Sequence, residues 1–180
     1  PLHKKQGAAL EMIRYFEDYA RRHGALLTLL LPFQISFYRR MGYGFAGKLY
    51  EYHLPTAVLP KPDGEARRHL RLLQPEDFDR VLACHSRFAA QNHGMVEKFE
   101  EEVRAARTDV QVRRIGYCAE DGTLRGYVAY RFESASDTNY TRNRLSVEEL
   151  VYDDGVVLRA LLGALKLQED LAQTVLLRTG

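Results

Sequence analysis

Two short stretches near the start of the sequence carry residue types that could hold an anion or move a proton. The first, HKKQGAAL (residues 3–10), places two lysines before Gly7 and two alanines after it. The second, FYRRMGYGFAG (residues 37–47), contains Tyr38 and three glycines with the Gly-x-Gly-x-x-Gly spacing of dinucleotide-binding loops. Both stretches are candidates for a phosphate site, and Tyr38 is a candidate proton donor.

The glycines of the second stretch lie in the wrong order of elements for a dinucleotide site. A dinucleotide loop of the Rossmann type needs a strand running into the glycines and a helix running out of them. Here a short helical turn, expected from Ser36 to Met41, precedes the glycines, and KLYEYHL (48–54) has the composition of a strand. We therefore interpret Gly42 and Gly44 as a tight turn that ends the helix.

The first stretch is the better phosphate loop. Gly7 opens a helical pattern that runs to about Arg22, with Gly24 as its stop. Small side chains at Ala8 and Ala9 let phosphate groups reach the free backbone N–H groups of the first turn, where the helix dipole favours negative charge. The alternative interpretation of the same residues is a solvated helix cap without a ligand.

Positive charge is concentrated in the same part of the chain. The formal net charge of the 180 residues is only +2, which argues against a dedicated nucleic-acid binder. Up to Tyr50, eight basic residues stand against three acidic ones: Lys4, Lys5, Arg14, Arg21, Arg22, Arg39, Arg40 and Lys48, against Glu11, Glu17 and Asp18. We expect an anionic ligand to bind here.

Composition argues against several other classes of protein. No apolar run approaches the roughly 20 residues that cross a membrane, so no membrane partner is expected. Cys84 and Cys118 give no disulfide framework, which makes a reducing cytoplasm the expected location. The six histidines lack metal-ligand spacing, and we expect no metal site. Cys84 and His85 point in different directions on a helix, so we interpret them as core residues rather than a nucleophile pair.

The element order predicts an α/β fold built from two related modules. After the first helix, the apolar run ALLTLLL (25–31) is typical of a strand covered on both faces. Prolines and Gly64 then interrupt the pattern. A second series follows, predicted as strand 69–73, a helix from Pro75, a helix through Met95, Phe99 and Val103, a hairpin over 112–133, strand 145–152, helix 155–168 and strand 174–178.

The first segment contains only elements that correspond to the end of the second series, namely a helix, a strand, a short helix and a strand. We therefore predict that residues 1–58 are the C-terminal half of a first, cofactor-binding domain. Residues 59–66 are predicted to be a linker, and residues 67–180 a second domain.

The two stretches together resemble the Gcn5-related N-acetyltransferase (GNAT) superfamily. Its members carry Arg/Gln-x-x-Gly-x-Gly/Ala at a helix start and, after a strand, a short helix ending in Tyr-x-x-x-Gly-Phe/Tyr. Residues 4–9, KKQGAA, resemble the first motif with lysine in place of the leading residue, and residues 38–43, YRRMGY, resemble the second. PLHKKQG joined to FYRRMGYG, with a second module following, looks most like the enhanced intracellular survival (Eis) family of tandem GNAT acetyltransferases. The resemblance is strong over 1–54 and rests on element order over 67–180.

The resemblance implies a mixed central sheet flanked by helices, and an enzyme that moves an acetyl group from acetyl-CoA to a primary amine such as an aminoglycoside, a polyamine or a lysine-like acceptor. Such a transfer passes through a tetrahedral oxyanion and expels a thiolate. The resemblance implies that the Tyr38 hydroxyl is the catalytic acid that protonates the sulfur. The implied cofactor-binding residues are Lys4, Lys5, Gln6, Gly7, Ala8, Ala9 and Arg40. For Tyr38 the alternative is a core tyrosine, and for Arg40 a solvated helix residue.

The second module carries carboxylates where a pyrophosphate would bind. Its strand ends in Asp153-Asp154-Gly155, and aspartate is a good helix cap that would repel a diphosphate. We expect this module to have no cofactor loop and to shape the substrate pocket or an oligomer contact. Acidic residues such as Glu148 and Glu149 are candidates to line a pocket for a polyamine or an aminoglycoside.

We expect the sequence to be an internal fragment and not a complete enzyme. It begins at Pro1, so the strand that the family places before the loop would lie upstream, and Gly180 is not expected to be the terminal carboxylate that the family uses as base. The resemblance suggests a homo-oligomer, a hexamer. The rival hypothesis is a non-catalytic GNAT-like scaffold, in which Lys4, Lys5 and Tyr38 are surface residues.

Overall fold

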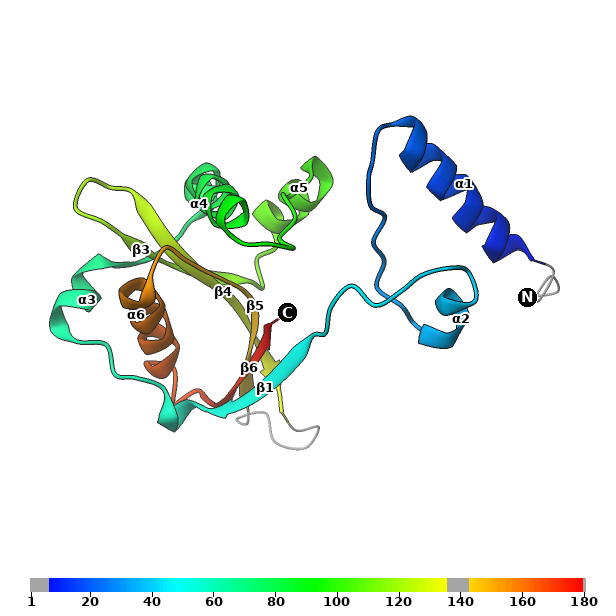
Figure 1. Ribbon diagram of the computed structural model, residues 1–180. Helices are drawn as coiled ribbons and strands as arrows, with labels where there is room; N and C mark the ends of the chain where they lie inside the picture. The colour runs from blue at the N-terminus through cyan, green and yellow to red at the C-terminus, as the bar shows by residue number, and fades with distance from the viewer. Residues whose placement is uncertain (1–6, 136–142, 180) are drawn as a thin grey trace. The chain divides into compact units, whose positions relative to one another are not determined.

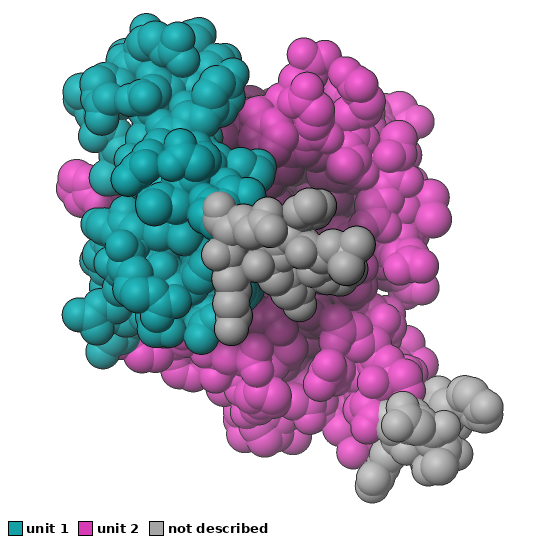
Figure 2. Space-filling view, turned by 90° about the vertical axis from the view of Figure 1, so that its right-hand side faces the viewer, with its two compact units in different colours: residues 1–48, 180 teal, residues 49–179 magenta. Residues whose placement is uncertain are grey.

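The computed structural model describes residues 7–135 and 143–179 and divides into two compact units (Figures 1 and 2). The first unit ends at Lys48, and the second begins at Leu49. The predicted cofactor-binding residues Lys4, Lys5 and Gln6 lie outside the described residues. The division of the protein into domains at residues 58 and 67 stays a prediction.

The first unit contains two helices, α1 (Ala8–Arg22) and α2 (Ile35–Arg39). Gly24, with a φ of 77°, follows α1, and its N–H donates to the carbonyl of Arg21 at 3.1 Å. This left-handed backbone costs glycine little, and it ends the helix by satisfying one of its last carbonyls. The predicted helix, its stop and the short second helix are confirmed.

Residues 25–31 do not form the predicted strand. Leu26 and Leu31 are 102% and 90% exposed, and the segment has no regular secondary structure. A strand needs neighbours that accept its backbone hydrogen bonds and cover its side chains, and no strand among the described residues pairs with this one. The prediction of a strand covered on both faces is therefore wrong for this chain.

The second unit is built on one six-stranded mixed sheet, in the order β1-β6-β5-β4-β3-β2 (Figure 1). Strands β5 and β6 are parallel, and the other neighbours are antiparallel. The predicted hairpin is confirmed, with Gly122 at a φ of 84° in its turn. The strands are β1 (Tyr50–Pro55), β2 (Leu70–Leu72), β3 (Arg113–Cys118), β4 (Leu124–Ser134), β5 (Asn143–Tyr152) and β6 (Ala172–Thr179).

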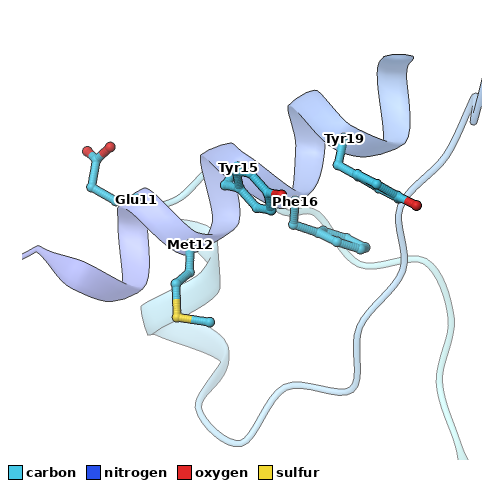
Figure 3. Close-up of a pocket in the computed structure, with 5 residues that line it drawn as sticks. All are labelled: Glu11, Met12, Tyr15, Phe16 and Tyr19. Atoms are coloured by element: carbon cyan, nitrogen blue, oxygen red, sulfur yellow. The ribbon is translucent and has the colours of Figure 1, made fainter. Parts of the chain in front are cut away.

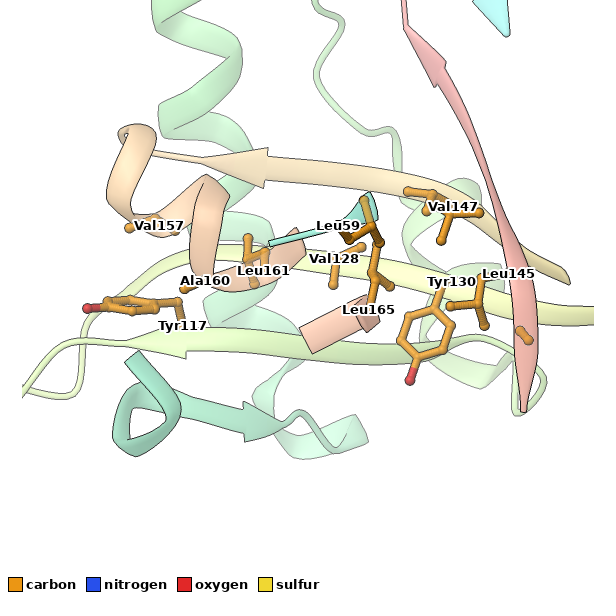
Figure 4. Close-up of a cluster of buried hydrophobic side chains, with 12 residues drawn as sticks. Leu59, Tyr117, Val128, Tyr130, Leu145, Val147, Val157, Ala160, Leu161 and Leu165 are labelled. Carbon is orange, nitrogen blue, oxygen red and sulfur yellow. The ribbon is translucent and has the colours of Figure 1, made fainter. Parts of the chain in front are cut away.

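Helices cover both faces of this sheet. Alternate residues of β4 enter two different cores because successive strand side chains point to opposite faces. Val128 and Tyr130 pack with α6 (Gly155–Lys166) in the core of Figure 4, whereas Tyr127 and Ala129 pack with α4 (Phe78–Gln91). The α/β class with a mixed, helix-flanked sheet is therefore confirmed.

Two further helices differ from the sequence prediction. Helix α3 (Gly64–His69) begins within the predicted linker, because the Asp63 carboxylate accepts a hydrogen bond from the Ala66 N–H at 2.6 Å and caps it. Helix α5 (Glu100–Thr108) starts later than predicted, so Met95 and Phe99 precede it. The glutamates of its first turn favour that start because they face the positive end of the helix dipole.

Strand β1 belongs to the sheet of the second unit. It pairs with β6, with Leu54 opposite Val175. Directly after it, the Thr56 hydroxyl donates to the carbonyl of Ala172 at 2.8 Å. Residues 50–58, predicted as the end of a first domain, thus pack with the second unit. The helices of the described residues include none long and apolar enough to span a membrane.

Candidate functional site

The start of α1 is open to a ligand. Gly7 has a φ of 85°, no side chain among the described residues caps the helix, and Gly7, Ala8 and Ala9 are all exposed. A Cβ on Gly7 would meet no atom within 4 Å. Because the first N–H groups of a helix have no acceptor within it, those of Ala8 and Ala9 can donate to an anion. This geometry leaves room for the phosphate group that the sequence analysis predicts here.

The charges of the first unit are compatible with an anionic ligand. Two of the three acids of α1 are paired within the helix, Glu11 with Arg14 at 2.7 Å and Asp18 with Arg21 at 2.6 Å, whereas Glu17 forms no ion pair with a described residue. Arg39 and Arg40 form no ion pair with any residue in 7–135 or 143–179. Their positive charge is therefore not neutralised by a described carboxylate.

Tyr38 lies in α2 within a group of aromatic rings. Its half-buried ring makes edge contacts with Phe33, Phe37 and Tyr43, at centroid distances of 5.5, 5.2 and 6.2 Å. These contacts fix the ring, while its hydroxyl forms no hydrogen bond with a described residue. The phenol can therefore donate its proton to a group outside this part of the chain.

The turn after α2 explains the first two glycines of the second stretch. The N–H of Gly42 donates to the carbonyl of Arg39 at 3.2 Å, and Gly42 has a φ of 97°. Gly42 thus ends the helix as predicted, whereas Gly44 lies in the following coil without a positive φ. Arg40 is exposed directly after α2.

The structure adds Tyr43 as a residue that the sequence marked only as a motif position. Its hydroxyl is buried and has no hydrogen-bond partner among the described residues. Buried polar groups normally find a partner, so this hydroxyl is an exception. No pattern in the sequence indicates it.

The described contacts do not join the two predicted parts of the site. Gly7, Ala8 and Ala9 stand at the start of α1, and Tyr38 stands in α2, both in the first unit. A cavity of about 580 Å³ beside α1 involves neither (Figure 3). Its lining is mainly apolar: Glu11, Met12, Tyr15, Phe16 and Tyr19.

The equivalent position in the second unit is closed by a side chain. The Asp154 carboxylate accepts hydrogen bonds from the N–H groups of Val156 and Val157 at 2.9 and 3.0 Å, which confirms the predicted cap. The pKa of Asp154 is lowered, most strongly by the hydrogen bond from the Val157 N–H. The Arg125 guanidinium, 2.7 Å away, and the hydrogen bond from the Val156 N–H lower it further. An ionised carboxylate therefore occupies the donors that a phosphate would need.

Cys84 and His85 lie where the core interpretation places them. Both are buried, and Cys84 packs in the core beneath α4. Burial raises the pKa of the Cys84 thiol to about 11, so it is not a thiolate at neutral pH. The described residues hold no group of three or more histidine, cysteine or acidic side chains placed to bind a metal.

Two family models match separate parts of the chain. One model of the acetyltransferase (GNAT) domain matches residues 1–46, and a second model with the same description matches residues 92–180. The mixed sheet with helices on both faces matches the GNAT fold. Residues 1–46 and 92–180 are therefore each similar to the GNAT acetyltransferase domain.

Solved structures give the particular resemblances. The chain aligns over 100% of its length with GCN5-related N-acetyltransferases from Kribbella flavida (23% identity, TM-score 0.76) and Anabaena variabilis (14%, 0.84). It aligns over 98% with Eis1 from Mycobacterium abscessus (22%, 0.72). It spans 43%, 45% and 45% of those three chains, less than half of each. No curated protein matches by sequence.

Proposed function

We propose that this chain is part of an acetyl-CoA-dependent N-acetyltransferase whose acceptor is a primary amine, such as an aminoglycoside, a polyamine or a lysine-like group. One observation carries the proposal. The segment that matches a GNAT acetyltransferase domain contains a helix start with small side chains, which no described side chain caps or covers.

The cofactor would be held by the residues around that helix start. The backbone N–H groups of Ala8 and Ala9 would bind the pyrophosphate, together with Gln6 and Gly7. Lys4 and Lys5, by the family resemblance, would add positive charge. Arg40, exposed and without a described ion pair, would contact the phosphates or the substrate.

The transfer itself needs a proton at the leaving sulfur. The amine nitrogen attacks the thioester carbonyl carbon, a C–N bond forms, and the C–S bond breaks with its electron pair on sulfur. The Tyr38 hydroxyl gives its proton to that sulfur, while the amine nitrogen gives a proton to a base. A well-placed acid of this kind contributes about 10²–10⁴ in rate.

The second unit would serve the reaction without binding acetyl-CoA. Asp154 already occupies the helix-start donors there, which supports a role in shaping the substrate pocket or an oligomer contact. By resemblance to Eis-type tandem acetyltransferases, the intact protein would be a cytoplasmic homo-oligomer, a hexamer.

The first test is calorimetric titration of acetyl-CoA into the full-length protein. We expect affinity on the order of micromolar for the wild type and loss of binding in Gly7→Glu, whose carboxylate would occupy the phosphate site. Gly24→Glu is the matched control: Gly24 stands at the other end of α1, with a φ of 77° against 85° and equally open space. It should bind as the wild type does.

Each other outcome is informative. Equal loss in Gly7→Glu and Gly24→Glu would show that strain in α1, not the phosphate site, abolishes binding. No binding to the wild type would remove the acetyltransferase proposal and leave a GNAT-shaped scaffold, in which the exposed apolar residues of the first unit would meet a partner.

A further inference from the structure

A second cavity, of about 570 Å³, lies beside the β2 edge of the sheet in the second unit. It is lined by residues of α3, of β2, and of the end of β3 with the turn that follows it. This volume is in the range of cavities that hold small molecules. Because its lining is mainly polar, the cavity suits a polar ligand.

Two arginines that line this cavity have no carboxylate partner. Arg68 and Arg71 form no ion pair with a described residue, whereas Arg104 and Arg178 of the same unit do. The Arg71 guanidinium is held in place because its Nη1 donates to the carbonyls of Arg68 and Leu70, at 2.5 and 2.9 Å. Guanidinium N–H groups that remain free can donate in pairs to the oxygens of a phosphate.

His69 lines the same cavity in a fixed orientation. Its ring stacks on that of Tyr117, with the centroids 5.0 Å apart, and its Nδ1 lies 2.9 Å from the carbonyl oxygen of Cys118. Because a carbonyl oxygen only accepts, Nδ1 carries the proton of this hydrogen bond. Nε2 has no described partner, so it can accept from a ligand hydroxyl or, when protonated, donate to a phosphate oxygen.

Two carboxylates share the cavity with these groups. Glu65 and Glu120 are exposed and form no ion pair with a described residue, including the arginines of the same cavity. An ionised carboxylate only accepts hydrogen bonds, and the hydroxyl groups of a sugar can donate to it. The lining thus offers donors to a phosphate and acceptors to hydroxyl groups.

We propose that this cavity binds a sugar phosphate. Arg68, Arg71 and His69 bind the phosphate oxygens, and Glu65 and Glu120 accept hydrogen bonds from the sugar hydroxyls. The ligand needs no amine, and all of these residues belong to the second unit. The proposal therefore does not depend on acetyl transfer in the first unit.

Calorimetric titration of glucose 6-phosphate into the full-length protein tests the site. We expect saturable binding to the wild type and equal binding to Gly7→Glu, which blocks the phosphate site proposed in the first unit. Arg68→Gln should bind at least about tenfold more weakly, because it removes a charged donor. Arg159→Gln is the matched control and should bind as the wild type does. Arg159 is also exposed and has no described ion pair, but it does not line the cavity.

Glucose and inorganic phosphate test the two parts of the ligand separately. Each should bind at least about tenfold more weakly than glucose 6-phosphate, since each makes only part of the contacts. Glu120→Ala should weaken the binding of glucose 6-phosphate but not that of inorganic phosphate, because it removes an acceptor for the sugar alone.

Three results would overturn the proposal: no binding of glucose 6-phosphate to the wild type, equal binding to Arg68→Gln and Arg159→Gln, or equal affinity for glucose 6-phosphate and inorganic phosphate. Loss of binding in Gly7→Glu with full binding in Arg68→Gln would assign the phosphate to the first unit and equally reject this cavity.

Discussion

At the scale of single residues, removing the Tyr38 hydroxyl is the most direct test of the proposed proton transfer. Its ring is held by Phe33, Phe37 and Tyr43, so Tyr38→Phe keeps the packing and removes only the proton. We expect kcat of the full-length enzyme to fall at least about tenfold, with little change in acetyl-CoA affinity. Steady-state kinetics with an acceptor amine, beside calorimetry, measure both quantities.

Tyr43→Phe is the matched control for that experiment, since it removes the neighbouring hydroxyl of the same motif. It should keep turnover, because the Tyr43 hydroxyl is buried among the described residues and has no hydrogen-bond partner there. Unchanged turnover in Tyr38→Phe would end the assignment of Tyr38 as the acid.

His85 predicts how the stability of the protein depends on pH. Burial, with the charge of Lys98, lowers its pKa, although Glu149, Glu102 and Glu97 oppose this. Just below the usual value of about 6.5, the unfolded chain therefore binds a proton that the folded chain does not. Stability should fall as the pH drops through this window, with a slope of at most about 1.4 kcal/mol per pH unit.

The variant His85→Gln should flatten this dependence between about pH 7 and the lowered pKa, because glutamine does not titrate. Urea unfolding at a series of pH values measures it. A wild-type slope that persists in the variant would assign the proton uptake to another group.

Helix capping belongs to the element scale, and Asp154 at the start of α6 is the case to test. Its carboxylate holds two backbone N–H groups that the helix cannot satisfy. Asp154→Ala should lower the free energy of unfolding by about 1 kcal/mol. Asp154→Asn, which keeps an acceptor oxygen, should lose much less. Equal losses would attribute the effect to the ion pair with Arg125.

Two segments have the composition of strands, but only one of them forms a strand, because only one has a neighbouring strand to pair with. Residues 48–54 and 25–31 both read as strands, but only the former finds a partner, β6. Composition indicates that a segment can form a strand, whereas pairing decides whether it does. The same dependence explains α3: one cap at Asp63 turned part of a predicted linker into a helix.

At the scale of the whole molecule, the core lies in the second unit. Leu161 is fully buried between α6 and the sheet (Figure 4), while Leu26 in the first unit is fully exposed. Leu161→Ala should therefore lower the free energy of unfolding by about 2–5 kcal/mol. Leu26→Ala should change it by no more than about 0.5 kcal/mol.

Denaturant unfolding of the full-length protein, followed by circular dichroism, compares the two leucine variants. A loss for Leu26→Ala as large as that for Leu161→Ala would mean that a further part of the protein covers residues 25–31.

The sequence by itself determined the elements whose signals are local. Helix α1 and its stop at Gly24, the hairpin across Gly122 and the cap at Asp154 each depend on residues a few positions apart, so they could be predicted. The open helix start at Gly7 is local in the same sense.

Only the tertiary structure decided the relations between distant residues. Lys98 meets Glu149 across 51 positions, and β1 joins β6 rather than a sheet of its own. No periodicity encodes such pairings, because they follow from which buried faces and backbone groups find partners once the chain is folded. The composition of residues 25–31 is therefore that of a strand, but among the described residues the segment has no strand to pair with and does not form one.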